Sequence, residues 1–189
     1  MSLLAVQGGA TGTGTVTLLA PVTNTNRTLT LPDATGTVLT TATAGTPING
    51  PAFSAYQNSG SQSVTASTFT KVQFNTEEFD TNSNYDNATN YRFTPTVAGY
   101  YQVNSCVACT ATSGTLYAIS LYKNGAGFKN GNDLRAASTV NNVVVSTLVY
   151  MNGSTDYLEV YIFIAGTTPT VNSGVSPTYF QAALVRSAI

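Results

Sequence analysis

The side chains best suited to chemistry in this sequence are a small group of carboxylates. Glu77, Glu78, Asp80 and Asp86 lie close together along the chain. Clustered carboxylates can act as a general acid and base, or can bind a hard cation such as calcium. A solvated loop explains the same residues without any chemistry, and we prefer that interpretation. We therefore predict no catalytic site, no metal site and no cofactor.

The sequence contains no histidine. Nucleophiles activated by histidine and zinc sites that use histidine are therefore excluded. Cys106 and Cys109 have CxxC spacing, but they fall in a predicted strand, where an odd separation places them on opposite faces. Because no second cysteine pair exists, we interpret both as small buried residues of a protein made in a reducing compartment. The sequence predicts a protein that is not an enzyme.

Charge and hydropathy exclude two further classes of partner. Charged residues make up 8% of the chain and its net charge is −1, so we expect no basic surface for nucleic acid or anionic lipid. No run of about 18 apolar residues occurs, which argues against membrane insertion. Residues 1–6 lack a basic start and form too short an apolar run for a signal peptide.

Residues that favour β-strands are abundant in the chain, which has 11 Tyr and 8 Phe. Strands are therefore expected to position any functional side chain. A turn between Pro95 and Gly99 is specified locally, because proline cannot donate to a ladder and glycine can take a positive φ. After it, Tyr101, Val103 and alternate residues to 107 share one face. Strands are expected at 52–57, 69–74, 91–93, 100–107, 116–123, 143–151, 157–164 and 179–185. This spacing predicts an all-β, antiparallel jelly-roll sandwich over residues 49–189.

Residues 1–48 differ from the rest of the chain in composition and pattern. Thr-Gly-Thr occurs at 11–13 and at 35–37, and two short alternating segments, 15–19 and 27–31, lie between them. The segment has few large apolar residues and cannot bury enough surface to fold alone. We predict an extended β-rich stem or arm that is stable when chains wrap together; a disordered leader is the alternative.

One predicted strand, 157–164, is apolar on both faces. Its even positions are aliphatic, and its odd positions include Tyr157, Tyr161 and Phe163. A strand of a monomeric sandwich normally shows one face to water. We therefore predict that these three aromatic residues meet another subunit. The alternative is that a loop of the same chain, 167–177, covers them.

Several spaced motifs resemble the globular head of the complement q subcomponent and its tumour-necrosis-factor-like relatives. The resemblance implies a jelly roll assembled as a homotrimer, which agrees with the trimer interface predicted from the strand pattern at Tyr157, Tyr161 and Phe163. Pro95 lies one residue earlier than in the family, and Ala182 stands where glycine is common. Family members often hold calcium near the trimer apex, where Asp156 falls, but the neighbouring ligands do not match. The matching motifs cover about 51–186: Ala52-Phe53-Ser54-Ala55, Val72-Gln73-Phe74-Asn75, Tyr85-Asp86, Phe93, Gly99, Tyr101, Val103, Lys123-Asn124-Gly125, Asp156, Leu158, Val160, Phe180 and Leu184.

The Thr-Gly-Thr repeats and Asn26-Arg27-Thr28-Leu29-Thr30-Leu31-Pro32-Asp33 resemble the start of bacteriophage fibre and virion-surface proteins. Together the two resemblances imply a virion structural protein, made in the host cytoplasm and displayed on the virion surface. It would be a trimeric knob or short fibre, either a capsid decoration or head fibre or a tail fibre. Its N-terminal arm would bind capsid or tail proteins, and its head would adhere to the host or stabilise the shell. The alternative is a secreted complement-q-like binding protein or a polysaccharide-binding adhesin.

The predicted loops 82–90, 125–133 and 167–179 are rich in Tyr, Asn, Ser and Gly. This composition suits adaptable recognition of a host glycan or protein. We name Tyr85, Asn87, Phe128 and Asn130 as candidate receptor-facing residues; ordinary surface loops are the alternative.

Overall fold

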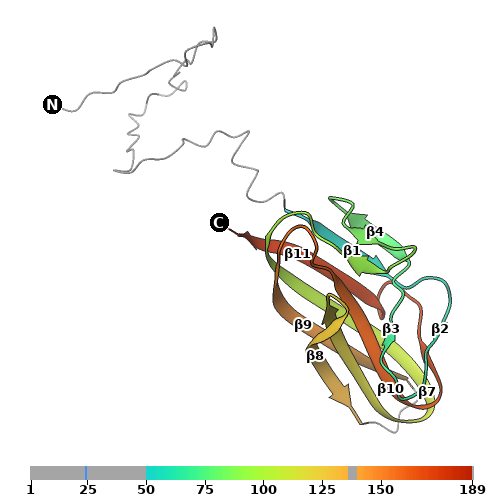
Figure 1. Ribbon diagram of the computed structural model, residues 1–189. Coiled ribbons are helices and arrows are strands. Elements are labelled where there is room, and N and C mark those ends of the chain that lie inside the picture. Colours follow the sequence, from blue (N-terminus) through green and yellow to red (C-terminus); the bar gives the residue numbers. More distant parts are fainter. Residues whose placement is uncertain (1–23, 25–49, 136–139, 189) are drawn as a thin grey trace. The chain divides into compact units, whose positions relative to one another are not determined.

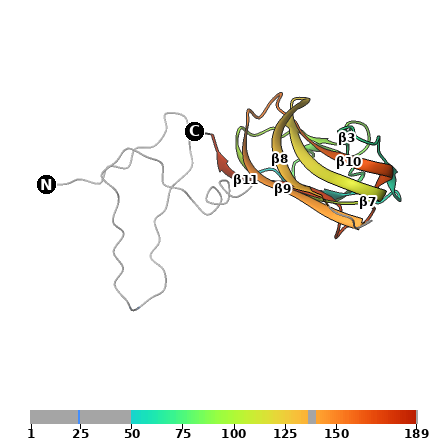
Figure 2. The same cartoon turned by 90° about the horizontal axis from the view of Figure 1, so that it is seen from below.

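The computed structural model describes Asn24 and residues 50–135 and 140–188. The stem predicted for residues 1–48 therefore lies, apart from Asn24, outside the described residues. The described part is built of antiparallel strands that pack as two layers (Figures 1 and 2), which confirms the predicted all-β jelly roll. None of these residues forms a helix long and apolar enough to span a membrane.

Eleven strands make up the sandwich, several of them only two residues long. They are β1 (Ala52–Tyr56), β2 (Gln62–Ser63), β3 (Thr70–Lys71), β4 (Thr76–Asp80), β5 (Tyr85–Asp86), β6 (Arg92–Phe93), β7 (Gly99–Lys123), β8 (Ala126–Leu134), β9 (Val140–Met151), β10 (Leu158–Val171) and β11 (Tyr179–Ser187).

The long strand β7 belongs to both layers. Its first part, 99–110, pairs with β11 and β9, and β1 and β4 continue that layer beyond β11. We call this the β9 layer. Its second part, 112–123, pairs with β8 and β10, and β3 and β6 continue beyond β10. We call this the β10 layer; Figure 2 shows β3 and β10 above β9 and β11.

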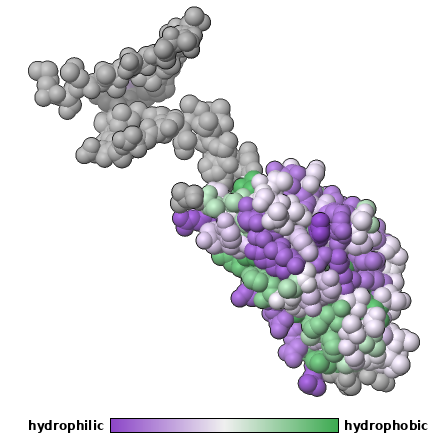
Figure 3. All heavy atoms as spheres, viewed as in Figure 1, coloured by the Kyte–Doolittle hydropathy of each residue, from purple (hydrophilic) through white to green (hydrophobic). Residues whose placement is uncertain are grey.

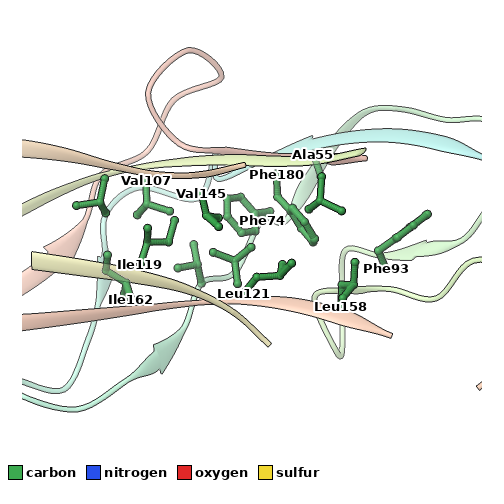
Figure 4. Close-up of a cluster of buried hydrophobic side chains, with 14 of the residues drawn as sticks. Ala55, Phe74, Phe93, Val107, Ile119, Leu121, Val145, Leu158, Ile162 and Phe180 are labelled. Atoms are coloured by element: carbon green, nitrogen blue, oxygen red, sulfur yellow. The ribbon is translucent and has the colours of Figure 1, made fainter. Parts of the chain in front are cut away.

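The core lies between the two layers. Val107, Val145 and Phe180 point inward from the β9 layer, and Ile119 and Ile162 point towards them from the β10 layer (Figure 4). All are buried, and each large side chain contributes about 1.5–3 kcal/mol by leaving water. The predicted inward face of 101–107 is confirmed, since its alternate residues are buried.

The turn between Pro95 and Gly99 is confirmed, but glycine is needed there for a different reason than expected. Gly99 does not adopt a positive φ. A Cβ at this position would instead collide with Arg186 O and Leu184 of β11. The Tyr101 hydroxyl donates to Val97 O at 2.7 Å. Close packing against β11 and this hydrogen bond, rather than backbone freedom, fix the turn.

Candidate functional site

The acidic cluster holds the local fold together. Glu78 Oε2 accepts a hydrogen bond from Ser54 Oγ at 2.6 Å, and Asp80 Oδ2 accepts one from Tyr85 N at 2.6 Å. Asp86 accepts from the backbone N–H groups of residues 88–90 and from the Asn90 side chain. These bonds, that of Thr89 N first, lower the pKa of Asp86 to about 2. Within the described residues, no group of three or more acidic, cysteine or histidine side chains could hold a metal ion.

Asp156 is buried and fully engaged by two turns. Its Oδ1 accepts from Asn124 Nδ2 at 2.8 Å, and its Oδ2 accepts from Asn152 N at 3.0 Å. Lys123 Nζ lies 2.8 Å from the same Oδ2. Both carboxylate oxygens therefore have protein partners, and the side chain serves a structural purpose.

Cys106 and Cys109 are free thiols, and the prediction that both are buried is confirmed. Burial first, and the neighbouring Cys106 second, raise the pKa of Cys109 to about 12. Its Sγ lies 3.3 Å from Asn141 O. A protonated thiol without solvent contact is neither a nucleophile nor a metal ligand.

The outer face of the β9 layer carries a group of exposed apolar side chains, which we call the apolar face. Leu148 is 53% exposed, and a groove of about 660 Å³ runs between it, Tyr100 and Val185. Figure 3 shows hydrophobic atoms in green along the edge where Figure 1 labels β11 and β9. The apolar face comprises Tyr100 of β7, Val144, Leu148 and Tyr150 of β9, and Val185 of β11.

Polar groups on this face bond to each other. Gln102 Nε2 donates to Asn104 Oδ1 at 3.2 Å and to Ser146 Oγ at 3.1 Å, and Ser146 Oγ donates to Asn104 Oδ1 at 2.7 Å. Arg186 is the one charged residue in β9, β11 and residues 99–110. A surface that is apolar, internally hydrogen-bonded and nearly uncharged is typical of an interface between proteins.

The aromatic residues predicted at the trimer interface lie on the outer face of the β10 layer. They are half-buried by their own chain. Arg92 Cζ lies 4.5 Å from the Tyr157 ring centroid. The Tyr161 ring stacks on Tyr122 at 3.9 Å, and the Phe163 ring lies 5.5 Å from Phe69.

The alternative left open by the sequence is that these aromatic residues are covered by another part of the same chain. The covering side chains come from positions 69, 92 and 122, however, and not from loop 167–177, of which 167–171 belong to β10. Contact of these aromatic residues with another subunit stays a prediction.

One predicted receptor-facing residue is wrong. Tyr85 is only 6% exposed, its ring stacks 4.7 Å from Phe53, and its hydroxyl donates to Phe74 O at 3.0 Å. It belongs to β5, which pairs with β6 and turns the side chain into the core. The sequence does not predict this burial, because a two-residue strand is too short to show an alternating pattern of apolar residues.

The other three candidates reach the surface to different degrees. Phe128 is 42% exposed, Asn130 is exposed and Asn87 is half-buried. Phe128 and Asn130 lie on strand β8 and not in the predicted loop 125–133. Receptor contact by these residues stays a prediction.

A polar cleft of about 570 Å³, which no sequence motif predicts, opens at the flank of the β10 layer. Its walls come from segments far apart in the chain: the loop after β1, the short strands β2 and β3, and the loop between β5 and β6. The lining residues are Ser59, Ser61, Gln62, Ser63, Thr70, Lys71, Gln73, Thr89 and Tyr91.

Comparison with solved structures finds proteins with a similar architecture. Over 74% of this chain and 96% of the other, it superposes on the Eiger tumour necrosis factor of S. frugiperda with a TM-score of 0.58 and 11% identity. The globular domain of zebrafish complement 1qA gives 0.53 and 22% identity, over 74% of this chain and 99% of that domain. Murine APRIL gives 0.53 and 12%, over 71% and 98%.

These likenesses show the fold: the described head is a jelly roll of the complement-q and tumour-necrosis-factor type. No protein-family model matches the chain, and the sequence comparison with curated proteins gives no match.

Proposed function

We propose that the protein is a homotrimeric knob or short fibre on the surface of a bacteriophage virion, a structural and binding protein rather than an enzyme. Residues 1–48 anchor it to capsid or tail proteins, and the jelly-roll head adheres to the host surface or stabilises the shell. Three heads in one trimer, and many trimers on one particle, turn weak contacts into firm attachment.

The observation that carries this proposal is the apolar face. Large side chains such as Leu148, Tyr150 and Val185 project from the outer face of the β9 layer. Contiguous apolar patches of this kind favour burial against a partner. A second copy of the chain suits the surface, because it brings the same nearly uncharged face, in which Arg186 is the one charged residue of β9, β11 and residues 99–110. The complement-q resemblance implies a homotrimer, which is consistent with this.

We place the trimer contact on the apolar face rather than on the outer face of β10. Tyr161 and Phe163 already have aromatic partners in their own chain, so a partner subunit would remove less apolar surface from water there. On β9, Leu148 and Val144 have about half of their surface exposed. The gain from burial is therefore larger on β9.

The virion assignment is supported by the resemblance of residues 11–37 to the start of phage fibre and virion-surface proteins. A capsid decoration and a tail fibre are both compatible with an anchor of this length. Antibodies against the head, located on intact virions by electron microscopy, separate the two by labelling either capsid lattice positions or the tail. Unlabelled virions would contradict the proposal.

Two solution experiments test the remaining parts. Light scattering of the full chain is expected to give the mass of a trimer, and a stable monomer would contradict the proposed assembly. Incubation with host capsule or lipopolysaccharide is expected to release no new reducing ends. Their appearance would show a polysaccharide depolymerase instead.

A further inference from the structure

We infer that the polar cleft between β2, β3 and the loop before β6 binds neutral sugar units of a cell-surface glycan. This inference rests on the proposed adhesive function, and it gives that function a site and a ligand class. The cleft volume of about 570 Å³ falls within the range of roughly 300–1,000 Å³ typical of small-ligand sites.

The cleft presents hydroxyl and amide groups that are free to bind a ligand. Within the described part of the chain, the side chains of Ser61, Ser63, Gln73 and Thr89 make no hydrogen bond. Hydroxyl groups both donate and accept, and a primary amide does the same through two atoms. Such a lining matches the hydroxyl groups of a sugar, which need donors and acceptors side by side.

The cleft floor is held in place by the protein. Gln62 Nε2 donates to Lys71 O at 2.7 Å, and Gln73 N donates to Gln62 Oε1 at 2.9 Å. One side chain thus fixes β2 against the segment that follows β3. A floor that is already ordered reduces the entropy lost when a ligand binds.

Charge in the cleft favours a neutral ligand over an anionic one. Lys71 is the only charged residue of the lining. Its Nζ lies 2.6 Å from Glu159 Oε1 and donates to Asn90 O at 3.1 Å. The Glu159 side chain is 6% exposed, so its negative charge faces the lysine at close range. The pair is neutral as a unit and offers little attraction to uronate, sialate or phosphate groups.

Tyr91 supplies the aromatic surface of the cleft. Its backbone has φ 49°, a conformation uncommon for residues other than glycine, asparagine and aspartate. The neighbouring loop holds it there, because Asp86 binds the backbone at positions 88–90 and Lys71 binds Asn90 O. Backbone strain of this kind is often kept where a side chain must face a ligand. The half-buried ring can pack against the C–H face of a pyranose.

The cleft stays open in the proposed trimer. Its residues lie in β2, β3 and adjoining loops, and both strands pair with β10. The apolar face is the outer surface of the opposite layer. Assembly through β9 and β11 therefore leaves three clefts per knob exposed to solvent.

The test measures binding of the full-length chain to an array of immobilised oligosaccharides. Neutral members contain glucose, galactose, mannose, rhamnose or N-acetylglucosamine; acidic members contain uronic or sialic acid. We expect binding to at least one neutral member. Tyr91→Asn, which removes the ring and tolerates the positive φ, and Thr89→Val, which removes one hydroxyl at constant shape, each weaken it about tenfold or more. The matched control, Phe79→Asn, removes a 51% exposed ring of β4 outside the cleft and leaves binding unchanged.

Two outcomes overturn the inference: no binding to any neutral member, whether or not acidic members bind, or loss of binding in Phe79→Asn with retention in Tyr91→Asn. Light scattering of each variant shows whether the trimer persists. If the protein is a trimer on virions but binds no neutral glycan, the sugar-binding inference is wrong and the proposed virion function stands. If the protein is a monomer and absent from virions, but binds neutral glycans through Tyr91, the proposed virion function is wrong and the sugar-binding inference stands.

Discussion

Lys123 Nζ lies 2.8 Å from Asp156 Oδ2, and this ion pair joins the end of β7 to the turn before β10. Asn124 strengthens the junction, since its Nδ2 donates to Asp156 Oδ1 at 2.8 Å and its Oδ1 accepts from Tyr157 N at 2.9 Å. Two turns, one closing the β7–β8 hairpin and one linking β9 to β10, are thereby fixed to one buried carboxylate. This junction helps to set the register of the paired strands β7 and β10, in which Leu158 lies opposite Lys123.

Asp156→Asn is expected to lower the free energy of unfolding by about 1–3 kcal/mol, because it leaves Lys123 without its charged partner and disturbs three hydrogen bonds. Burial alone would raise the pKa of Asp156, but hydrogen bonds from Asn124 and Lys123 outweigh it and lower the value. The stabilisation is therefore present above the unfolded-state pKa and lost as the pH falls through the lower folded value. Urea denaturation at pH 7 measures the loss. Asp133→Asn, an exposed change of equal charge, serves as control, and equal effects of the two variants would contradict the junction.

Asp86 gives a second pH-dependent prediction. Its folded pKa of about 2 lies below the unfolded value of about 3.9, so its contribution is complete above that value and vanishes as the pH falls towards 2. Asp86→Asn should therefore destabilise the chain at pH 5 and make little difference near pH 2. Urea midpoints of both proteins across this range measure the convergence. A difference that does not change with pH would show that the carboxylate charge is irrelevant to the loop.

Gly131 marks the close approach of β8 to β9. A Cβ there would collide with Val144 O and lie 2.5 Å from Ile119 Cγ2. Gly131→Ala is therefore expected to cost about 1–3 kcal/mol by overpacking, as strained insertions into packed sites do. Gly127→Ala on the same strand is the matched control, because its Cβ would lie 3.8 Å from Tyr122, an ordinary contact. Thermal unfolding of the two variants compares them, and equal melting temperatures would contradict the close contact.

The sequence predicted the long strands because their alternation matched the pleat. Residues 100–107 and 143–151 lie within β7 and β9, and the predicted strand 157–164 lies within β10 except for its first residue. It did not predict β8, because residues 126–134 are mostly polar or glycine and resemble a loop in composition. Strands of two residues, such as β5, are fixed by their tertiary partners, so the sequence alone does not predict that Tyr85 is buried.

The interface and the cleft were harder to foresee for different reasons. Strand 143–151 carries apolar residues on both faces, with Val145 inward and Leu148 outward, and the sequence shows the same pattern at 157–164. The pattern therefore indicates a subunit contact on strand 143–151 as well. The polar cleft had no such pattern, because its walls meet only after β2, β3 and residue 91 are brought together by the fold.

Cys109 should resist modification in the folded protein. It is buried, and burial raises its pKa to about 12, so the reactive thiolate is nearly absent at pH 8. Native protein is expected to take up no iodoacetamide at Cys109 over hours, whereas protein unfolded in guanidinium without reductant takes up label at both cysteines. Mass spectrometry counts the labels. Failure of the unfolded protein to react would reveal a disulfide and contradict the free thiols.

Leu148→Asp tests which face holds the trimer together. The side chain is already half exposed, so a charge there costs the isolated head little, but three buried carboxylates around one axis would be strongly unfavourable. We expect the variant to sediment as a folded monomer. Val175→Asp, an equally exposed apolar residue outside the apolar face, should remain trimeric.

Phe69→Asp places a charge beside Phe163 on the outer face of the β10 layer. If Phe69→Asp dissociates the trimer and Leu148→Asp does not, the subunits meet through Tyr157, Tyr161 and Phe163 as the sequence predicted, and the apolar face must serve another partner.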